Sequence, residues 1–564
     1  MNGKGNRERL RKARQASPPP VRFDPASLEE LVFERRVYEV ITPMFGGVVP
    51  RSPDPITPVR GTAIRGQLRF WWRAVRGGKS NGDLARLYEL EAEIWGMAAG
   101  GGAKAGASRT AAAESEAAYA VSAEAGFSEV AAAYAGAAGA APDEAGNADA
   151  GTAEAAAAEA TAEAAAEAAA AYPGAGKSGA DGQKPHRSMN VQIFVRMLTP
   201  HDPLRYETPY PQVNREEQRE RNGRNDRDLR QEPNSLWKKV AYVAFPLQST
   251  RGEPRLPPGR VIRGVKFALE LIYPKRHQED VHAALWAWET FGGLGARTRR
   301  GFGAIRLVEI DGRRIPPPAT VDDVRRDIEK KLKQYVGVDG KWPPGVPHLH
   351  PHMRLKVIGP SGPRAGSSGD DGRFRSAQTC YRNVEEAWTE LVSKLRAFRK
   401  KQVNGCSAWP EADAIRNLLR APGRRGRPQN EPKGEIIDKF PRAAFGLPIV
   451  FHFRGGKSDP REKNIELRGR LLGDGNRVDR LASPLILRPY ACQNGAVGLA
   501  LILENTGIFQ WRGHRLALQA GRRTYAVDPF LTPKEAQKIS PLQPLPLRTV
   551  DGKVDVLAAF FETL

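Results

Sequence analysis

The feature that most constrains the fold of this 564-residue chain is an alanine-rich stretch from Met97 to Lys184. Alanine is the best helix former, and Glu159, Glu163 and Glu167 recur every four residues, which favours helical structure in part of the stretch. It holds few large apolar side chains with which to build a core. We therefore predict a disordered or partly helical insertion that forms a long loop between two ordinary elements.

The charge of the chain is concentrated outside this insertion. Lys and Arg total 87 against 64 Asp and Glu, which gives a formal net charge of +23. The insertion holds 12 acidic and 4 basic residues, so the remaining residues, about 475 of them, carry about +31. An excess of this size predicts an anionic partner, with nucleic acid ahead of a membrane surface.

Several classes of protein are disfavoured by the sequence. Three cysteines, Cys380, Cys406 and Cys492, are too few for a disulfide scaffold and lack the CxxC spacing of zinc sites. The segment from Met1 to Gln15 is polar and basic, without the apolar centre of a signal peptide. No uncharged apolar run approaches the ~18 residues of a membrane helix. We therefore expect a soluble, cytoplasmic protein with no metal site, no cofactor and no membrane association.

The first half of the chain alternates strand-like and helix-like patterns. Strands are predicted at Val37–Thr42, Val191–Leu198, Val240–Pro246, Val261–Leu271 and Ala304–Ile310. Helices are predicted at Ile64–Val75, with Thr62 as a possible N-cap, at Leu84–Ile94 and at Glu279–Phe291. With one extra strand and one extra helix, this order is close to the β-α-β-β-α-β plan of ferredoxin-like domains.

A second half with the same mixture follows a linker. Residues 313–352 hold proline-rich punctuation around a charged helix, Val321–Tyr335. Strands are then predicted at Met353–Ile358, Leu447–Phe453, Ile465–Leu472, Pro484–Arg488 and Val497–Glu504, with a helix at Val384–Lys401. We therefore predict an α+β fold of two ferredoxin-like (RRM-like) domains, at residues 30–312, with the insertion at 97–184, and at residues 353–564.

The first candidate site is an arginine-rich helix. Arg65, Arg69, Arg73 and Arg76 fall at i, i+4, i+8 and i+11, on one helix face, shortly after Arg60. An adjoining apolar stripe consists of Ile64, Leu68, Trp71, Trp72 and Val75. Like charges four residues apart repel, so the stripe favours an anion along it, and arginine binds phosphate with two hydrogen bonds. The alternatives are a solvated basic face or a structural helix with buried ion pairs, and in all cases the tryptophans are expected in the core.

The second candidate site is a loop with five glycines and three arginines among the thirteen residues of Phe291–Gly303. It follows a predicted helix and lacks a GK[ST] ending, so it is neither a Rossmann nor a Walker loop. Exposed backbone N–H groups of glycine-rich loops bind anions, and a purely structural loop would not need three arginines. The predicted RNA-binding residues here are Gly292, Gly293, Gly295, Arg297, Arg299, Arg300, Gly301, Phe302 and Gly303. Phe302 is the candidate for stacking on a base.

These motifs resemble those of a known family. The stretch Gly292–Gly303 is similar to the glycine-rich loop of the RAMP superfamily of CRISPR-associated proteins. More narrowly, Thr42–Gly47 followed by Ile64–Arg73 resembles the first subunits of Cmr (type III-B) effector complexes, and Phe445–Ile449 and Ala482–Leu485 resemble their second domain. The long insertion departs from that pattern, as does Trp95 at a position that usually holds Phe, but every matched motif is retained.

The resemblance implies two RRM-like domains and a place in a multi-subunit, RNA-guided complex for antiviral defence. Its partners would be other Cmr subunits, the guide (CRISPR) RNA near its 3′ end, and target single-stranded RNA. It implies RNA binding without catalysis. Two alternatives remain open: a RAMP-type endoribonuclease acting on CRISPR RNA, although only His201 and Asp202 follow a strand without a recognisable acid–base spacing, and a generic basic interaction protein.

Overall fold

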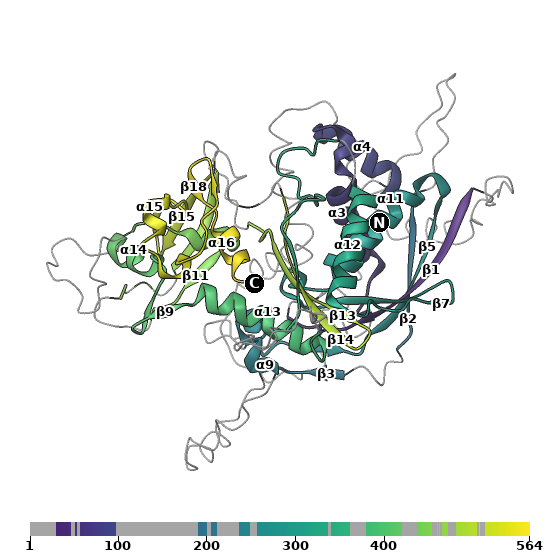
Figure 1. Ribbon diagram of the computed structural model, residues 1–564, viewed down its shortest axis with the longest axis horizontal. Helices are drawn as coiled ribbons and strands as arrows, with labels where there is room; N and C mark the ends of the chain where they lie inside the picture. The colour runs from purple at the N-terminus through teal and green to yellow at the C-terminus, as the bar shows by residue number, and fades with distance from the viewer. Residues whose placement is uncertain are drawn as a thin grey trace, which may run out of the picture. The chain divides into compact units, whose positions relative to one another are not determined.

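The computed structural model describes residues 30–46, 51–53, 57–96, 190–199, 205–210, 236–248, 257–336, 340–360, 380–419, 437–453, 459–460, 462, 465–471, 481–504, 507 and 514–564. The described part is a mixture of helices and antiparallel sheets (Figure 1). The alanine-rich insertion lies outside the described residues, as do His201 and Asp202.

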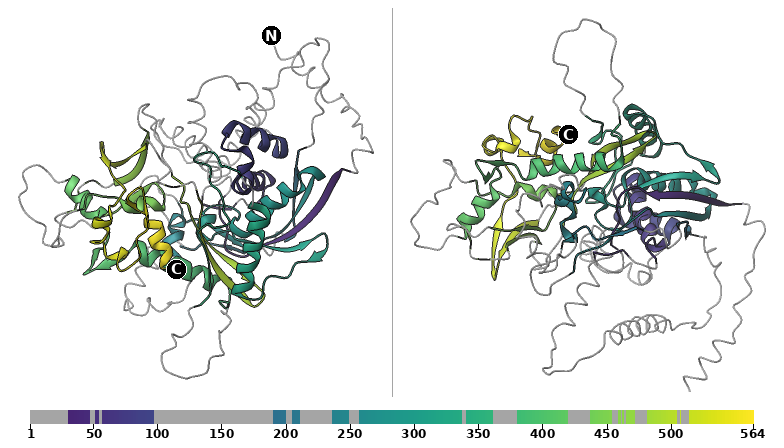
Figure 2. Two further views of the ribbon diagram at one scale, coloured as in Figure 1. Left: turned by 45° about the horizontal axis from the view of Figure 1, so that its top comes forward. Right: turned by 90° about the horizontal axis from the view of Figure 1, so that it is seen from below.

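The first sheet has its N-terminal strand at the centre. Its strands stand in the order β2 (Gln192–Met197), β5 (Lys266–Pro274), β1 (Leu31–Val40), β6 (Ile305–Ile310) and β7 (Arg313–Arg314). β1 pairs antiparallel with β5 on one side and with β6 on the other. Helices α3 (Gly61–Arg76) and α11 (Gln278–Phe291) pack against each other on one face of this sheet (Figures 1 and 2). The predicted β-α-β-β-α-β order is therefore present in the first half.

The side chains of the first core confirm the expected apolar stripe on α3. Ile64, Leu68 and Trp72 are fully buried, and Trp71 is nearly so. Trp288 of α11 meets Tyr38 of β1 edge to face, with ring centroids 5.3 Å apart. Aromatic pairs at this distance and angle are favourable beyond the area that they bury. The two helices and the central strand thus share one core.

One predicted strand is wrong. The segment Val240–Pro246 is helical: α9 (Leu236–Lys239) is followed by α10 (Ala241–Ala244) and a 3₁₀ turn, η3 (Phe245–Leu247). The buried residues are Val240, Val243, Ala244 and Leu247. They stand at i, i+3, i+4 and i+7, which is the spacing of one helix face rather than the alternation of a strand. The apolar run was short enough to be read either way.

Among its described residues, the second half contains two sheets of three or more strands, where a single ferredoxin-like domain was predicted, and two short two-stranded sheets. The first has the order β13 (Leu485–Cys492), β14 (Gly495–Ile502), β8 (Leu355–Ile358), and helix α13 (Val384–Arg399) packs on it. The second has the order β11 (Ile449–Phe451), β12 (Ile465–Leu471), β15 (His514–Ala520), β16 (Arg523–Val527). The elements β8, α13, β13 and β14 supply a β-α-β-β portion of the expected plan. A complete second ferredoxin-like domain stays a prediction, as do the domain boundaries.

The remaining elements are mostly short. They are α4 (Leu84–Trp95), β3 (Arg205–Glu207), β4 (Val261–Arg263), α12 (Val321–Val336), β9 (Gln402–Val403), β10 (Cys406–Ser407), α14 (Glu411–Leu418), α15 (Pro533–Ala536), β17 (Thr549–Val550), β18 (Lys553–Val554) and α16 (Val556–Glu562), with 3₁₀ turns η1 (Gly77–Ser80), η4 (Lys275–His277), η5 (Thr298–Arg300), η6 (Pro441–Phe445) and η8 (Ser540–Leu542). The charged helix expected in the linker is α12, and its apolar side chains Val324, Ile328 and Leu332 lie in the first core.

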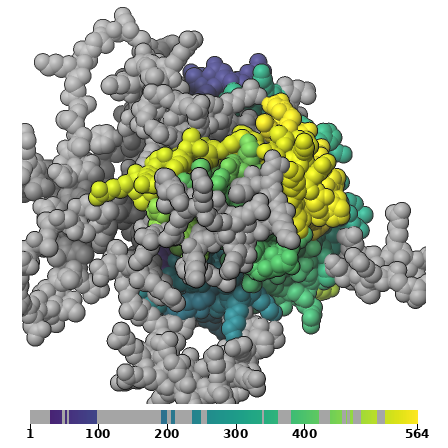
Figure 3. Space-filling model, turned by 90° about the vertical axis from the view of Figure 1, so that its left-hand side faces the viewer, coloured from purple at the N-terminus to yellow at the C-terminus, as the bar shows by residue number. Residues whose placement is uncertain are grey.

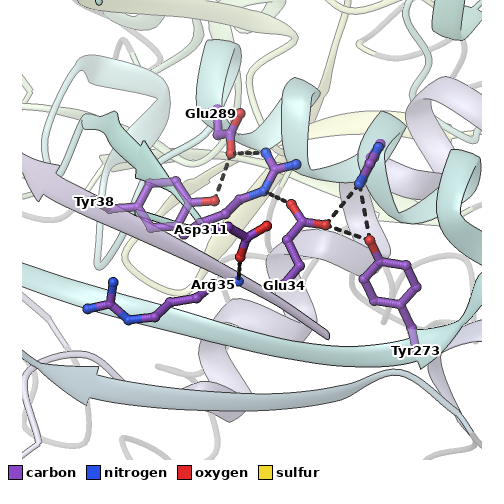
Figure 4. Close-up of polar contacts among 8 residues, drawn as sticks. Glu34, Arg35, Tyr38, Tyr273, Glu289 and Asp311 are labelled. Atoms are coloured by element: carbon purple, nitrogen blue, oxygen red, sulfur yellow. Dashed lines mark hydrogen bonds and ion pairs between the residues drawn. The ribbon is translucent and has the colours of Figure 1, made fainter. Parts of the chain in front are cut away.

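A buried polar network ties the central strand to α11 (Figure 4). Arg36 donates to Glu34 at 2.5 Å and to Glu289 at 2.8 Å, and Tyr38 donates to Glu289 at 2.7 Å. On the other side, Tyr273 donates to Glu34 at 2.5 Å. Burial by itself would raise the pKa of Glu34. The hydrogen bond with the His282 ring and the charge of Arg36 outweigh burial and lower that pKa to about 2.

This network predicts an acid-sensitive contribution to stability. Because the folded pKa of Glu34 lies below its ordinary value of 4.5, the ionised carboxylate stabilises the fold above about pH 4.5. That contribution is lost as the pH falls towards 2, and its size is about 3 kcal/mol. Melts of the wild type and of Glu34→Gln between pH 6 and 2 measure the difference in their free energies of unfolding. This difference should shrink by that amount as the pH falls from 6 to 2. Glu309→Gln, which removes a more exposed pair with Arg35, serves as the control, and a difference independent of pH would contradict the assignment.

Candidate nucleic-acid interface

The predicted arginine-rich helix exists, but it begins at Gly61, so Thr62 lies inside the helix and does not cap it. Its N-cap residue is Arg60, which is half-buried and makes no capping bond with its side chain. Arg65 donates to the backbone carbonyl of Trp95 at 2.8 Å. Burial lowers the pKa of Arg65, and the nearby charge of Arg69 lowers it further.

The arginine stripe faces carboxylates of the protein itself. Arg73 donates to both oxygens of Glu91 on α4 at 2.7 Å, and Arg69 also pairs with Glu91. The Glu91 side chain is 0% exposed, and that of Arg73 is 11% exposed. Arg76 pairs with Glu279 at 2.9 Å and Asp280 at 3.3 Å on α11. The anion that relieves repulsion along this face is therefore supplied by α4 and α11.

The alternative of a solvated basic face is wrong for three of these arginines. Arg69, Arg73 and Arg76 are mostly or fully buried and are held in ion pairs. The sequence reasoning missed Glu91 because it stands on another helix, where it looks like an ordinary polar residue. The structure thus favours the alternative of a structural helix with buried ion pairs, and guide-RNA contact by the stripe stays a prediction.

The buried pairs give a stability prediction. Replacing Arg69 and Arg73 together by Ala leaves Glu91 as an uncompensated buried charge, which typically costs about 3–5 kcal/mol. Denaturant melts of this double variant should show a loss of that order. Arg86→Ala is the matched control, since Arg86 and Glu89 form an exposed pair on α4, and such pairs contribute under about 1 kcal/mol. A double variant as stable as the control would mean that Glu91 is not held by these arginines.

The glycine-rich loop connects α11 to β6, as predicted. Glycine is required at some of its positions for steric reasons. Gly301 has φ of +85°, and a Cβ there would lie 2.5 Å from the indole nitrogen of Trp388. Gly303 has φ of +59°, and a Cβ there would overlap the backbone carbonyl of Leu294. No other residue type fits such positions without displacing its neighbours. The glycines therefore allow close packing, whatever else the loop binds.

Two of the three loop arginines contact the second half of the chain. Arg299 donates to the carbonyl of Ser483, and Arg300 donates to that of Leu485 at 2.7 Å and that of Phe445 at 3.4 Å. These three acceptors belong to the two stretches that the sequence resemblance singled out in the second half. The contacts explain how motifs far apart in sequence form one local structure.

Two residues of the second half that the sequence reasoning missed also hold the loop. Arg488 of β13 is buried and donates to the carbonyls of Glu289 at 2.8 Å, Gly292 at 2.7 Å and Ile305 at 2.6 Å. Trp388 of α13 donates its indole N–H to the carbonyl of Arg300 at 2.8 Å. Neither residue stands near the loop in sequence, so no local pattern could have identified them.

The prediction that Phe302 stacks on a base is wrong in this structure. Its side chain is fully buried. Its ring lies edge to face with Phe45, at a centroid distance of 5.0 Å, and with Trp388, at 4.9 Å. A ring enclosed in this way has no face for a nucleotide. Phe302 instead anchors the loop, and the accessible part of the loop is Gly295–Arg300, which is exposed or half-buried.

Other site types receive no support from the described residues. Among them, no group of three His, Cys, Asp or Glu side chains is placed to hold a metal ion. None of the helices in the described ranges is long and apolar enough to cross a membrane.

Comparison with known proteins supports the family resemblance. The RAMP superfamily model matches residues 37–130 and 173–306, a range that includes α3 and the glycine-rich loop. The first half of the chain is therefore similar to the RAMP superfamily model, and the resemblance seen in the motifs is confirmed at that level. No curated protein matches the chain.

Two solved structures are similar to this chain at a low level. Cmr1 from Pyrococcus furiosus in the apo form is 15% identical, with 84% of this chain and 88% of that chain covered and a TM-score of 0.33. A chain of the Type III-B Cmr-beta complex bound to cognate target RNA is 12% identical, with 85% and 96% covered and a TM-score of 0.37. At this level of similarity, neither structure defines the function of this chain.

Proposed function

We propose that this chain is a non-catalytic RNA-binding subunit of a type III-B CRISPR effector complex, acting in the cytoplasm. It would contact the guide RNA near its 3′ end, with target single-stranded RNA and other Cmr subunits as further partners. The observation that carries the proposal is the RAMP match, whose second segment, 173–306, ends just after the glycine-rich loop. The same proposal includes a fold of two ferredoxin-like domains.

The electrostatics of the chain support an RNA partner. Outside the alanine-rich insertion the net charge is about +31, and the backbone charge of nucleic acids dominates their attraction to basic proteins. Several arginines, such as those on α3, are neutralised by carboxylates of the chain itself. The accessible part of the glycine-rich loop, Gly295–Arg300, still brings three arginines together near the surface. This loop is therefore the part of the described chain that best fits contact with an RNA backbone.

Binding to single-stranded RNA, titrated over a range of salt concentrations, tests the proposal. The logarithm of the binding constant should fall linearly with that of the salt concentration, by about 0.7 for each neutralised phosphate. Arg297→Ala should weaken binding and make this slope shallower by about 0.7, whereas Arg86→Ala, on α4, should change neither. Absence of salt-dependent RNA binding by the full chain would contradict the proposal.

Two further measurements separate the alternatives. The full chain incubated alone with single-stranded RNA should leave it intact, while specific cleavage would favour the endoribonuclease alternative. Purification from cells that express the other subunits should recover RNA of a discrete length together with those subunits. Recovery of heterogeneous RNA without any subunit would favour a generic basic interaction protein.

A further inference from the structure

The segment before β4 presents one aromatic ring to solvent. The apolar side chains of this segment, Val240, Val243, Ala244 and Leu247, are buried in the same cluster as Phe302 and Trp388. Phe245 lies between them in sequence but outside that cluster, and its side chain is 57% exposed. The ring is therefore displayed at the surface by a segment that is anchored against the glycine-rich loop.

A single exposed apolar side chain is common on protein surfaces and has no meaning by itself. Phe245 differs because an arginine of the glycine-rich loop lies over its ring. The guanidinium carbon of Arg297 is 4.4 Å from the ring centroid, which is within the range of cation–π contacts. The exposed Phe33 and Phe194, on the first sheet, have no such contact recorded among the described residues.

More cations border the same segment. Tyr242, one turn before Phe245, has Lys400 at 5.4 Å and the guanidinium of Arg399 at 5.8 Å from its ring centroid. Arg51 donates to the carbonyls of Pro246 and Gln248. Burial lowers the pKa of Arg399, and Glu411, whose charge acts against that shift, is itself buried and paired with Arg442. Two aromatic rings of this segment, Tyr242 and Phe245, thus each have a cation nearby.

The segment also has a defined position. Helices α9 and α10 pack against α13 (Figure 1). Figure 3 shows this part of the chain, in blue-green, at the surface beside the green part that includes α13. Arg399, near Tyr242, is the last residue of α13, and Lys400 follows it directly. Arg297 belongs to the glycine-rich loop. Three elements that are far apart in sequence therefore contribute to one surface.

Proteins that bind single-stranded nucleic acid combine these two components. Positive charges follow the backbone, and bases stack on aromatic rings, with arginine adding cation–π contacts. We propose that Phe245 is a stacking platform for one base of bound single-stranded RNA, and that Arg297, lying over its ring, fixes its orientation. This inference rests on the proposed function and goes further, because it names a base-contacting residue.

The occupant follows from the surrounding charge. A protein partner would be expected to cover an apolar patch, whereas Phe245 is a single exposed ring with Arg297 over it. Three further cations contact other residues of the same segment: Arg399 and Lys400 lie over Tyr242, and Arg51 donates to the carbonyl of Pro246. Such a set of cations fits a chain of phosphates. Every base has a flat face, so stacking here selects single-stranded RNA without selecting a sequence.

The test is a titration of the full chain with fluorescently labelled single-stranded RNA. Phe245→Ala should weaken binding by about 5- to 150-fold, the range typical for loss of one stacked base. The slope against salt should be unchanged, because no phosphate contact is removed. Phe245→Tyr keeps the ring and should bind close to wild type. The matched control is Phe194→Ala, on β2, at 51% exposure, which should have no effect.

A second measurement identifies the base contact directly. A set of RNAs is prepared, each with one abasic nucleotide at a different position. At one position, the missing base should weaken binding to the wild type. The same abasic RNA should bind Phe245→Ala as tightly as intact RNA does. Equal penalties in both proteins at every position would overturn the stacking contact. Thermal melts of each variant show whether a loss of affinity reflects unfolding. Phe245→Tyr, which keeps the ring, is a second control for unfolding.

The outcomes separate this inference from the proposed function. If the wild type binds RNA with a clear salt dependence and Phe245→Ala binds equally well, the stacking platform is refuted while the proposed function stands. If Phe245→Ala binds RNA normally but no longer co-purifies with other subunits, the ring is a protein contact and the inference is again refuted. If the wild type binds no RNA at any salt concentration, both fail together.

Discussion

The candidate interface depends on one buried guanidinium. Arg488 reaches from β13 to three backbone carbonyls, at the end of α11, in the glycine-rich loop and at the start of β6. Burial lowers the pKa of Arg488 to about 10, so it remains charged at neutral pH, with carbonyl oxygens in place of water. Because these carbonyls belong to the two ends of the loop, the geometry of the loop is linked to the second half of the chain.

The same structure shows why the charge of a basic protein does not locate its ligand. The arginines that the structure describes have different roles. Some, such as Arg73 and Arg76, neutralise buried carboxylates, and others, such as Arg300, bind backbone carbonyls of the second half of the chain. Arg297 instead lies over an exposed ring. The excess of basic over acidic residues is visible in the composition. Which role each arginine takes depends on which residues are its neighbours in space.

The two phenylalanines near the glycine-rich loop illustrate the limit of local patterns. Phe302 stands among arginines in sequence and looked suited to base stacking, yet it is buried between Phe45 and Trp388. Phe245 stands in a short apolar run that resembled a strand, yet a helical turn leaves it outside the buried set. In both cases exposure is decided by what packs against the residue, and for Phe302 that neighbour lies 86 positions away at Trp388.

The sequence by itself determined the mixed α+β character, the helices α3, α4, α11 and α13 within a few residues, the apolar stripe of α3 and the family motifs. These follow from periodicity, capping and turn chemistry, all of which act over a few residues. Tertiary structure alone decided the pairing of the α3 arginines with Glu91, the presence of two larger sheets in the second half and the anchoring of the loop by Arg488. Those features join residues that are distant in the chain, and their free energy comes from desolvated charges and close packing that exist only once the fold has formed.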